Sequence, residues 1–538
     1  MHEEVGIETN HLELSDKGLS DLAKTLRASK IITNDWSDYI SNGGANPLHL
    51  PMPKCAVLNI TNAAHNAIWP VNKTAVLKYI MQFWDMQGNY FQKNIDCTAQ
   101  GNSSMSMPKK NAAADIFDSE WGGDSFAVKF GEWIPQDSFH LKAYQGDYFI
   151  GVGPVGYKLF NQITSTRDIY TNRDWKKALI PSKEDIGLNE RALADMDDKY
   201  SLDNDARCFP DGFPVIVFLN DNFYGVYSWQ IKKHRDNYMM SKKKPLHIHL
   251  DGAIGELSLF ALNGNLNWDI ISGVEPYPGT NNREGFEVRN PKPKKSKDGW
   301  DVVCIDGTKY DADTNRKELM GEDNVGYDSS NTDHFNTNKT KQAIIGLSTY
   351  IPELKQMELD SATSTEIREK IVEHFDVQAI IDYLIFSDVV ANVDGFFKNW
   401  QWITYDGVKW FVEPYDLDAI FGWSGWSVVS PSYSRLGYIK NYPTWWIINY
   451  YQTELETRYA NLREQGILTA DNILSIFRNW ISSIGTDNYQ REHDKWPYDR
   501  EHYAEGPLET HKDSIYRVSN WLEERLVVCD GYYNYSQN

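Results

Sequence analysis

The pattern of apolar and polar positions divides the chain into a strand-rich first half and a helical last third. Short apolar runs such as CAVLNIT, directly after Lys54, indicate strands in the first half. In the last third, STEIREKIVEHF and DVQAIIDYLIFSDVV carry apolar residues at three- and four-residue spacing, which is typical of helices. Asp376 is well placed to cap the second helix. The pattern therefore predicts an α+β fold.

Four segments follow from the same pattern. Residues 1–50 form a polar N-terminal extension, and residues 51–245 form a strand-rich part that carries lysines. Residues 246–345 resemble an insertion, because short strands alternate there with the basic linker PKPKKSKDGW and a run rich in Asn, Asp, Thr and Ser. Residues 346–538 form a helical part that carries acidic residues.

Composition and charge limit the function. The 538 residues carry a formal net charge of −21, which argues against a protein that binds duplex nucleic acid through clustered Lys and Arg. No secretory signal and no apolar run of about 18 residues is present, so the sequence predicts no membrane span. We expect a cytoplasmic protein or one that is incorporated in a spore or virus particle. The five cysteines form no CxxC or Cys/His cluster, which favours reduced structural thiols.

A hairpin flanked by polar residues lies between Ser387 and Gly422. QWITY and KWFVE are alternating, aromatic-rich strands, and the Asp-Gly pair between them is a strong signal for a short hairpin loop. Asp394 and Asn399 precede the hairpin and Asp416 follows it, so we expect them at one edge of a small sheet. Protein kinases use this order for a catalytic Asp, an Asn and a metal-binding Asp. Taken singly, each Asp also fits a turn or a helix cap.

Lysines in the first half are candidates for binding an anionic ligand. Lys129 in SFAVKF and Lys142 in SFHLKAY lie between apolar neighbours on predicted strands. A lysine on a buried face needs a partner, whereas an edge-strand lysine guards against aggregation, and both interpretations stay open. The loop QGNSSMSMPKKN ends in two further lysines, of which we consider Lys110. Lysines that neutralise phosphate and carboxylates that hold Mg²⁺ together suit a nucleotide with its metal ions.

The string GVGPVG, from Gly151 to Gly156, matches the G-x-G-x-x-G pattern of dinucleotide-binding loops. No repeating βαβ pattern surrounds it and a proline interrupts it. We interpret it as an ordinary turn before the helical segment YKLFNQI.

Taken in order, several motifs resemble the CotH family, the spore-coat-protein-H type of atypical protein kinases. The motifs are GNSSMSMPKKN with VKF after it, FLNDNFYGVYSWQIKKHRDNY, NVDGFFKN, YDLDAIFG and a late helix with Arg525. Each string alone is weak, and the ordered set is specific.

This resemblance implies a two-lobed protein-kinase-like fold with a strand-rich N-terminal lobe, a helical C-terminal lobe and inserted loops. It implies binding of ATP with Mg²⁺ or Mn²⁺. Residue by residue, Asp394 resembles the catalytic base, and Asn399 and Asp416 resemble metal ligands. Asp418 resembles a further ligand or a structural acid.

The resemblance also suggests residues that contact the nucleotide. Lys129 resembles the phosphate-contacting lysine, with Lys142 as the alternative, and Lys110 and Gln230 complete the expected cofactor-binding set. Gln230 stands where the family strand usually has Glu, and Tyr415 replaces the usual Trp before Asp416.

Three functions compete. The first is a protein Ser/Thr kinase that modifies a coat, capsid or surface protein. The second is a catalytically weak or inactive kinase fold that serves as a structural component of a spore coat or phage virion. The third pairs Asp394 with Glu413 or Asp416 as the carboxylates of a glycosidase. The expected partners are protein substrates or particle components, and the sequence leaves the oligomeric state open.

Overall fold

The chain consists of two compact units. The computed structural model describes residues 48–166, 210–252, 343–433, 442–497 and 511–536, with gaps inside these ranges, and four short strands between residues 285 and 320. The first unit, the barrel unit, comprises residues 1–151, 212–231 and 477–499. The second, the sheet–helix unit, comprises residues 152–211, 232–476 and 500–538. Helices and strands are mixed and the N-terminal region is rich in strands, so the predicted α+β class is confirmed.

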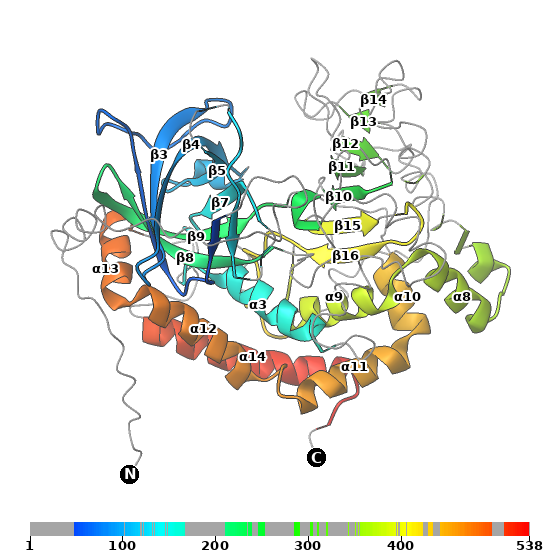
Figure 1. The fold of residues 1–538 in the computed structure, drawn as a ribbon. Coiled ribbons are helices and arrows are strands. Elements are labelled where there is room, and N and C mark those ends of the chain that lie inside the picture. The colour runs from blue at the N-terminus through cyan, green and yellow to red at the C-terminus, as the bar shows by residue number, and fades with distance from the viewer. Residues whose placement is uncertain are drawn as a thin grey trace, which may run out of the picture. The chain divides into compact units, whose positions relative to one another are not determined.

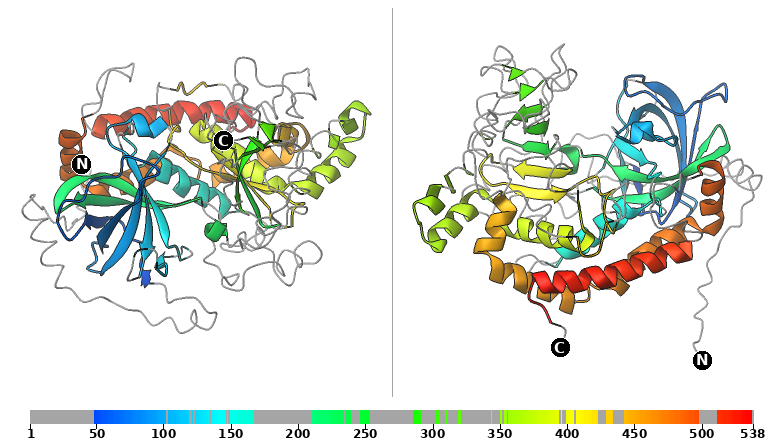
Figure 2. Two further views of the ribbon diagram at one scale, coloured as in Figure 1. Left: turned by 90° about the horizontal axis from the view of Figure 1, so that it is seen from above. Right: turned by 180° about the vertical axis from the view of Figure 1, so that it is seen from behind.

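A closed barrel of seven strands forms the barrel unit. The strands, in barrel order, are β2 (Ala56–Thr61), β3 (Leu77–Trp84), β4 (Tyr90–Gln100), β5 (Asn111–Phe117), β7 (Ser138–Lys142), β9 (Asn222–Ile231) and β8 (Gly212–Leu219). Neighbouring strands are antiparallel except β2 and β8, which are parallel. Figures 1 and 2 show these strands, coloured blue to green, curving around a common interior. Closure removes the exposed strand edges that would otherwise invite aggregation.

Aromatic side chains fill the barrel core. Phe83, Phe139 and Trp229 are buried there, and the rings of Phe139 and Trp229 lie 4.7 Å apart. A two-stranded parallel sheet of β1 (Leu48–Leu50) and β6 (Val128–Phe130) contributes further apolar side chains to the same core. The apolar runs of the first half therefore supply the barrel core, and alternate residues such as Val57 and Trp84 form a second, smaller apolar cluster.

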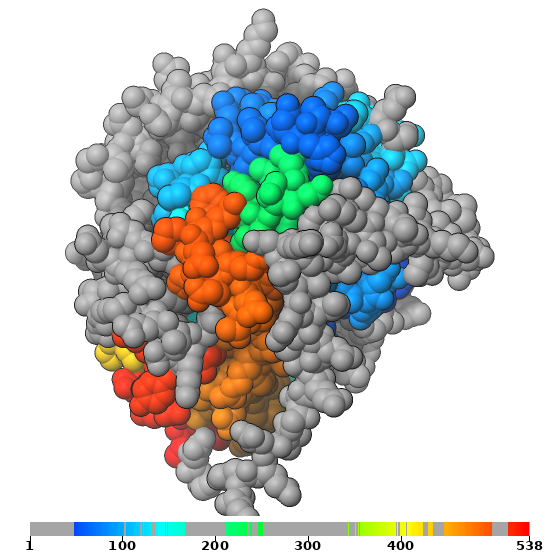
Figure 3. Space-filling view, turned by 90° about the vertical axis from the view of Figure 1, so that its left-hand side faces the viewer, coloured from blue at the N-terminus to red at the C-terminus, as the bar shows by residue number. Residues whose placement is uncertain are grey.

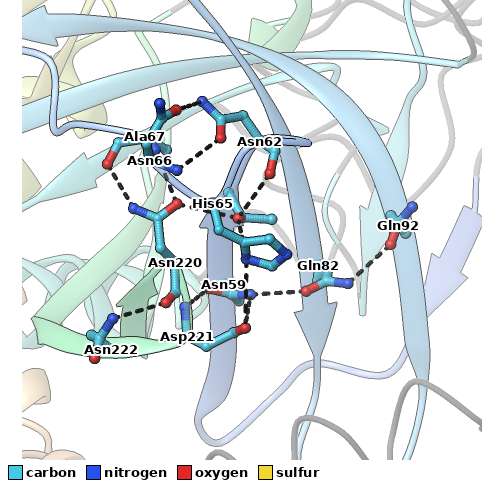
Figure 4. A network of polar contacts seen from close by, with 11 residues as sticks. Asn59, Asn62, His65, Asn66, Ala67, Gln82, Gln92, Asn220, Asp221 and Asn222 are labelled. Atoms are coloured by element: carbon cyan, nitrogen blue, oxygen red, sulfur yellow. Dashed lines mark hydrogen bonds and ion pairs between the residues drawn. The ribbon is translucent and has the colours of Figure 1, made fainter.

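The β8–β9 hairpin has a short turn of two residues. Leu219 pairs with Asn222, which leaves Asn220 and Asp221 as a two-residue turn with φ of 52° and 65°. Positive φ at both positions is what a type I′ turn requires, and Asn and Asp tolerate it. The Asn220 amide bonds both the N–H (3.0 Å) and the carbonyl (2.8 Å) of Ala67, so the turn fastens the loop that follows β2 (Figure 4).

Helix α13 (Thr486–Lys495) covers this hairpin. Figure 3 shows α13, in orange, against the green β8–β9 hairpin on the surface of the barrel unit. The Trp496 indole, just after the helix, donates to the Tyr224 carbonyl (2.6 Å). The Phe149 carbonyl accepts two hydrogen bonds, one from the Trp480 indole on the preceding helix α12 (3.0 Å) and one from the Tyr489 hydroxyl on α13 (2.7 Å). These bonds fix a C-terminal helix to the N-terminal barrel.

A seven-stranded antiparallel sheet organises the sheet–helix unit. In sheet order the strands are β14 (Leu319–Met320), β13 (Lys309–Tyr310), β12 (Val302–Cys304), β11 (Gly285–Asn290), β10 (Ile248–Gly252), β15 (Trp400–Thr404) and β16 (Phe411–Pro414). β10 pairs with β15, so strands from residues 246–345 extend the sheet of the predicted Ser387–Gly422 hairpin. Figure 1 shows this sheet above the helices of the unit.

The predicted β15–β16 hairpin is confirmed, but its loop is longer than two residues. Ile403 pairs with Phe411, and residues 405–410 connect the strands. The Asp406 carboxylate accepts hydrogen bonds from the backbone N–H groups of Val408 (2.8 Å) and Lys409 (2.9 Å). This bonding is an Asp-centred turn, which the Asp-Gly pair signals equally well.

Helices pack against one another and against the sheet. They are α3 (Val152–Thr164), α8 (Ser364–His374), α9 (Val377–Val390), α10 (Tyr442–Tyr450), α11 (Gln452–Glu464), α12 (Ala470–Ile484) and α14 (His511–Tyr532). Asp376 caps α9 as predicted, since its carboxylate accepts from the Ala379 N–H at 2.8 Å. The Phe375 and Trp402 rings meet edge to face at 5.9 Å, which joins the α8–α9 corner to β15.

No helix in the part of the chain described here is long and apolar enough to cross a membrane. Cys55, Cys97 and Cys529 are buried.

Candidate functional site

The open end of the β15–β16 hairpin brings Asn399 and Asp416 to adjacent positions. The Tyr415 N–H donates to the Asn399 carbonyl at 2.9 Å, one pair beyond Trp400 and Pro414. Asn399 and Asp416 both have left-handed backbones, with φ of 63° and 52°. Asn and Asp tolerate this conformation better than other residues that carry a Cβ, and Asn220 and Asp221 adopt it in an ordinary hairpin turn. The pairing of Asn399 beside Tyr415, rather than the backbone conformation alone, makes this edge the candidate site.

Three residues whose side chains carry oxygen, Asn399, Asp416 and Asp418, belong to this edge of the hairpin. Asp416 is half-buried and Asp418 is exposed, and the Asp418 N–H donates to the Asp416 carbonyl at 2.9 Å in a tight turn. Among the residues that the structure describes, no three His, Cys, Asp or Glu side chains form a metal site. The edge instead supplies two carboxylates and the Asn399 amide oxygen. That donor set suits Mg²⁺ or Mn²⁺, which keep several water ligands.

The segment that carries Asp394 follows the end of α9. Asp394 itself lies outside the described residues, so its catalytic role stays a prediction. The next residue, Gly395, is held because the Tyr383 hydroxyl donates to its carbonyl. Burial raises the pKa of Tyr383, so the hydroxyl stays protonated and remains a donor. A Cβ at Gly395 would lie 2.8 Å from the Tyr383 hydroxyl oxygen, which explains the glycine of the NVDGFFKN motif.

One cation near this edge was missed by the sequence interpretation. The Lys233 ammonium lies 4.4 Å from the centroid of the Tyr415 ring, and Tyr415 directly precedes Asp416. The contact is a cation–π interaction, which an aromatic residue before the acid makes possible. In the sequence, a cation at this position is indicated only by the two lysines that follow GVYSWQI.

Lys142 and Gln230 lie on one face of the barrel unit. Leu141 and Trp229 belong to the barrel core, so alternation places their neighbours Lys142 and Gln230 on the outer face of β7 and β9. Both are buried, at 5% and 2% exposure. The Gln230 amide donates to the Tyr144 hydroxyl at 2.7 Å. Lys142 and Gln230 are thus on adjacent strands, as two contacts to one ligand would require.

The other two predicted lysines lie elsewhere in the barrel unit. Lys129 is on β6, paired in register with His49 of β1, and it is 5% exposed. The Lys110 ammonium donates to the carbonyls of Met105 (2.9 Å) and Met107 (2.8 Å), so it closes its own loop. Lys129 and Lys110 therefore lie outside strands β7 and β9, which carry Lys142 and Gln230, and their contact with a nucleotide stays a prediction.

Lys109, which the sequence interpretation passed over, forms a buried ion pair. Its ammonium donates to the Glu492 carboxylate of α13 (2.5 Å) and to the Val226 carbonyl (2.5 Å), and it lies 4.3 Å from the centroid of the Tyr227 ring. Burial lowers the pKa of Lys109, and the Glu492 carboxylate opposes that shift. The other Glu492 oxygen accepts from the Val226 N–H (2.7 Å).

Gly225 makes room for this pair. A Cβ there would lie 2.8 Å from the second Glu492 oxygen and 3.0 Å from Lys109 Cε. The loop that ends in Lys109 and the strand β9, which are far apart in sequence, thus both contact the Glu492 carboxylate of α13.

The GVGPVG string belongs to a helix. α3 begins at Val152, inside the string, so the expected turn before the helix is wrong. The helix starts early because the Asp147 carboxylate accepts from the N–H groups of Phe149 (2.8 Å) and Gly151 (2.7 Å), which organises the preceding turn.

A family model described as CotH kinase protein matches residues 208–528, which is more than half of the chain. The match covers the β8–β9 hairpin, the seven-stranded sheet and the Asn399–Asp416 edge. No curated protein matches the chain.

Proposed function

The chain belongs to the CotH kinase protein family, and we propose that it is an atypical protein kinase that transfers the γ-phosphate of ATP to Ser or Thr side chains of a protein. One observation carries this proposal. Asn399 pairs with Tyr415, the residue directly before Asp416, so both proposed ligands belong to the end of the hairpin that corresponds to the metal-binding end in kinases. A coat, capsid or surface protein is the proposed substrate.

The proposed chemistry assigns one role to each group. Asn399, Asp416 and Asp418 would hold Mg²⁺ or Mn²⁺, which when bound neutralises charge on the phosphates. Asp394 would orient the substrate hydroxyl and accept its proton. The hydroxyl oxygen forms a bond to the γ-phosphorus while the bond to the bridging oxygen breaks, and ADP leaves. Positioning and charge neutralisation supply most of the rate in such transfers.

The barrel unit would contribute the nucleotide contacts. Lys142 and Gln230 are the best-supported pair because they share one face, and Lys129 and Lys110 are the alternatives. The proposal includes a two-lobed kinase-like arrangement, with the barrel unit as the N-terminal lobe. The division of the chain into a strand-rich unit and a second unit with a sheet and several helices supports it.

One observation favours a second candidate, a catalytically weak or inactive kinase fold that serves as a structural component of a spore coat or phage virion. Gln230 donates its amide N–H to Tyr144, where the family strand usually has a carboxylate. An amide cannot neutralise a lysine or bind a metal ion as strongly as a carboxylate, so turnover would be low.

Thermal unfolding with ATP separates these candidates. We expect ATP with Mg²⁺ or Mn²⁺ to raise the midpoint, because a ligand at 100 times its dissociation constant adds about 2.7 kcal/mol. ATP with a chelator should give a much smaller shift, and transfer of labelled γ-phosphate to protein should accompany the metal-dependent shift. No shift at millimolar ATP and metal would contradict the kinase and leave the structural component.

A further inference from the structure

We propose that helix α3 is a positioning element for the proposed metal-binding turn at Asp416, and that Tyr157 is the residue through which it acts. The inference rests on the proposed function, because it explains how the left-handed conformation of a proposed metal ligand is held. It also gives a role to the GVGPVG string, which the proposed chemistry leaves unused.

The contact between helix and turn is direct. The Asp416 N–H donates to the Tyr157 hydroxyl oxygen at 3.1 Å. Tyr157 is 1% exposed, so its ring is fixed by packing and its hydroxyl has a defined position. An amide N–H without an acceptor is costly when water cannot reach it. The hydroxyl therefore favours the conformer of Asp416 with a φ of 52° over conformers that turn the N–H elsewhere.

Close packing on the neighbouring residues supports the same arrangement. Leu417 and Ile420, on either side of Asp418, are fully buried. A Cβ at Gly156 would lie 2.6 Å from Ile420 Cδ1 and 3.0 Å from Leu417 Cδ1. The absent side chain lets α3 approach the turn closely enough for Tyr157 to reach Asp416. The last glycine of GVGPVG thus serves helix packing rather than phosphate binding.

The helix is itself anchored within the sheet–helix unit. The Arg458 guanidinium donates to the Ile163 carbonyl (2.6 Å) and to the Thr166 carbonyl (2.9 Å), at the C-terminal end of α3. The same guanidinium pairs with the Asp382 carboxylate of α9 at 2.8 Å. The Phe421 N–H, just beyond the turn, donates to the Val390 carbonyl at the end of α9 (2.7 Å). The turn therefore rests on two helices that one buried arginine joins.

Loss of the hydroxyl should act on metal binding more than on folding. Tyr157→Phe keeps the buried ring and removes only the acceptor for the Asp416 N–H. The carboxylate would then sample positions away from the metal. Groups that orient metal ligands typically change metal affinity about 10–100-fold when they are removed.

The test compares Tyr157→Phe with Tyr451→Phe in the full chain. Tyr451 is a matched control, since it is buried and its hydroxyl bonds a backbone carbonyl, that of Arg368 (2.8 Å), away from the turn. The first readout is the Mn²⁺ concentration that gives half of the ATP-dependent thermal shift. We expect it to rise about 10-fold or more for Tyr157→Phe and to stay unchanged for Tyr451→Phe.

A second readout is independent of nucleotide. Hydrogen exchange at the Asp416 amide should be faster in Tyr157→Phe than in the wild type, because the acceptor is gone. Gly156→Ala, which keeps the hydroxyl and crowds the turn, should also raise the Mn²⁺ requirement.

The outcomes distinguish this inference from the proposed function. If the wild type shows no metal-dependent shift, the proposed function fails, and with it any positioning of a metal ligand; the exchange rate then reports only whether Tyr157 holds the turn. If the wild type binds ATP with metal and Tyr157→Phe has an unchanged Mn²⁺ requirement, the inference is overturned while the function stands. Equal losses in both Tyr→Phe variants would also overturn it.

Discussion

Glu492→Gln will destabilise the barrel unit by about 3–5 kcal/mol, because it leaves the Lys109 ammonium buried without its counter-charge. Both side chains are almost fully buried, at 0% and 2% exposure. Gln can still accept from the Val226 N–H, so the change removes charge and keeps shape. Deprotonating Lys109 at pH 7 is the alternative, and from a usual pKa of about 10.4 it costs about 4.6 kcal/mol. The free energy of unfolding therefore falls by a similar amount whether Lys109 stays charged or loses its proton. Denaturant unfolding measures this loss.

A surface pair in the same unit provides the control. Lys93 and Asp118 are 2.5 Å apart, but Asp118 is 59% exposed. Asp118→Asn should therefore cost less than about 1 kcal/mol. Replacing both Lys109 and Glu492 by methionine should recover part of the loss, since no charge is then left buried. A loss below about 1 kcal/mol for Glu492→Gln would show that water or another group compensates Lys109.

The same pair shows where sequence-based prediction ends. Local signals predicted several of the strands, the Asp376 cap and the β15–β16 hairpin, because each depends on residues close together in the chain. The partner of Lys109, Glu492, is 383 residues away on α13, which carries none of the family motifs. Lys109 and Lys110 are adjacent residues of the same type, so the sequence does not distinguish them. Tertiary packing alone determines that Lys109 pairs with Glu492 and that Lys110 bonds carbonyls of its own loop.

The pattern of apolar and polar residues also does not predict which strands pair when they are far apart in the sequence. The barrel closes through the parallel pair of β2 and β8, which are separated by about 150 residues of sequence. β10 joins β15 although the sequence pattern separates them as insertion and helical part. Within the candidate site, the order of Asn399 and Asp416 around the hairpin was predictable. Their left-handed backbones and the Tyr157 contact were not, because both depend on packing against α3.

Asp416→Asn is expected to abolish metal-dependent ATP binding, with affinity lower by about 100-fold or more. The substitution is chosen for the backbone: Asn tolerates a φ of 52° as Asp does, so neither strain nor the N–H bond to Tyr157 should change. Only the negative charge and one oxygen ligand are lost. The midpoint of thermal unfolding without ligand should therefore match the wild type, and the metal-dependent shift should disappear.

Two further variants make this result specific. Asp418→Asn, at an exposed carboxylate two residues away, should have a smaller effect on metal affinity if Asp416 is the principal ligand. Asp394→Asn should bind ATP and metal normally and fail to transfer phosphate, because the proposed base acts only on the substrate hydroxyl. If Asp416→Asn and Asp394→Asn both transfer phosphate at the wild-type rate, the hairpin edge is not the catalytic site. In that case the left-handed residues serve only the packing of the turn on α3.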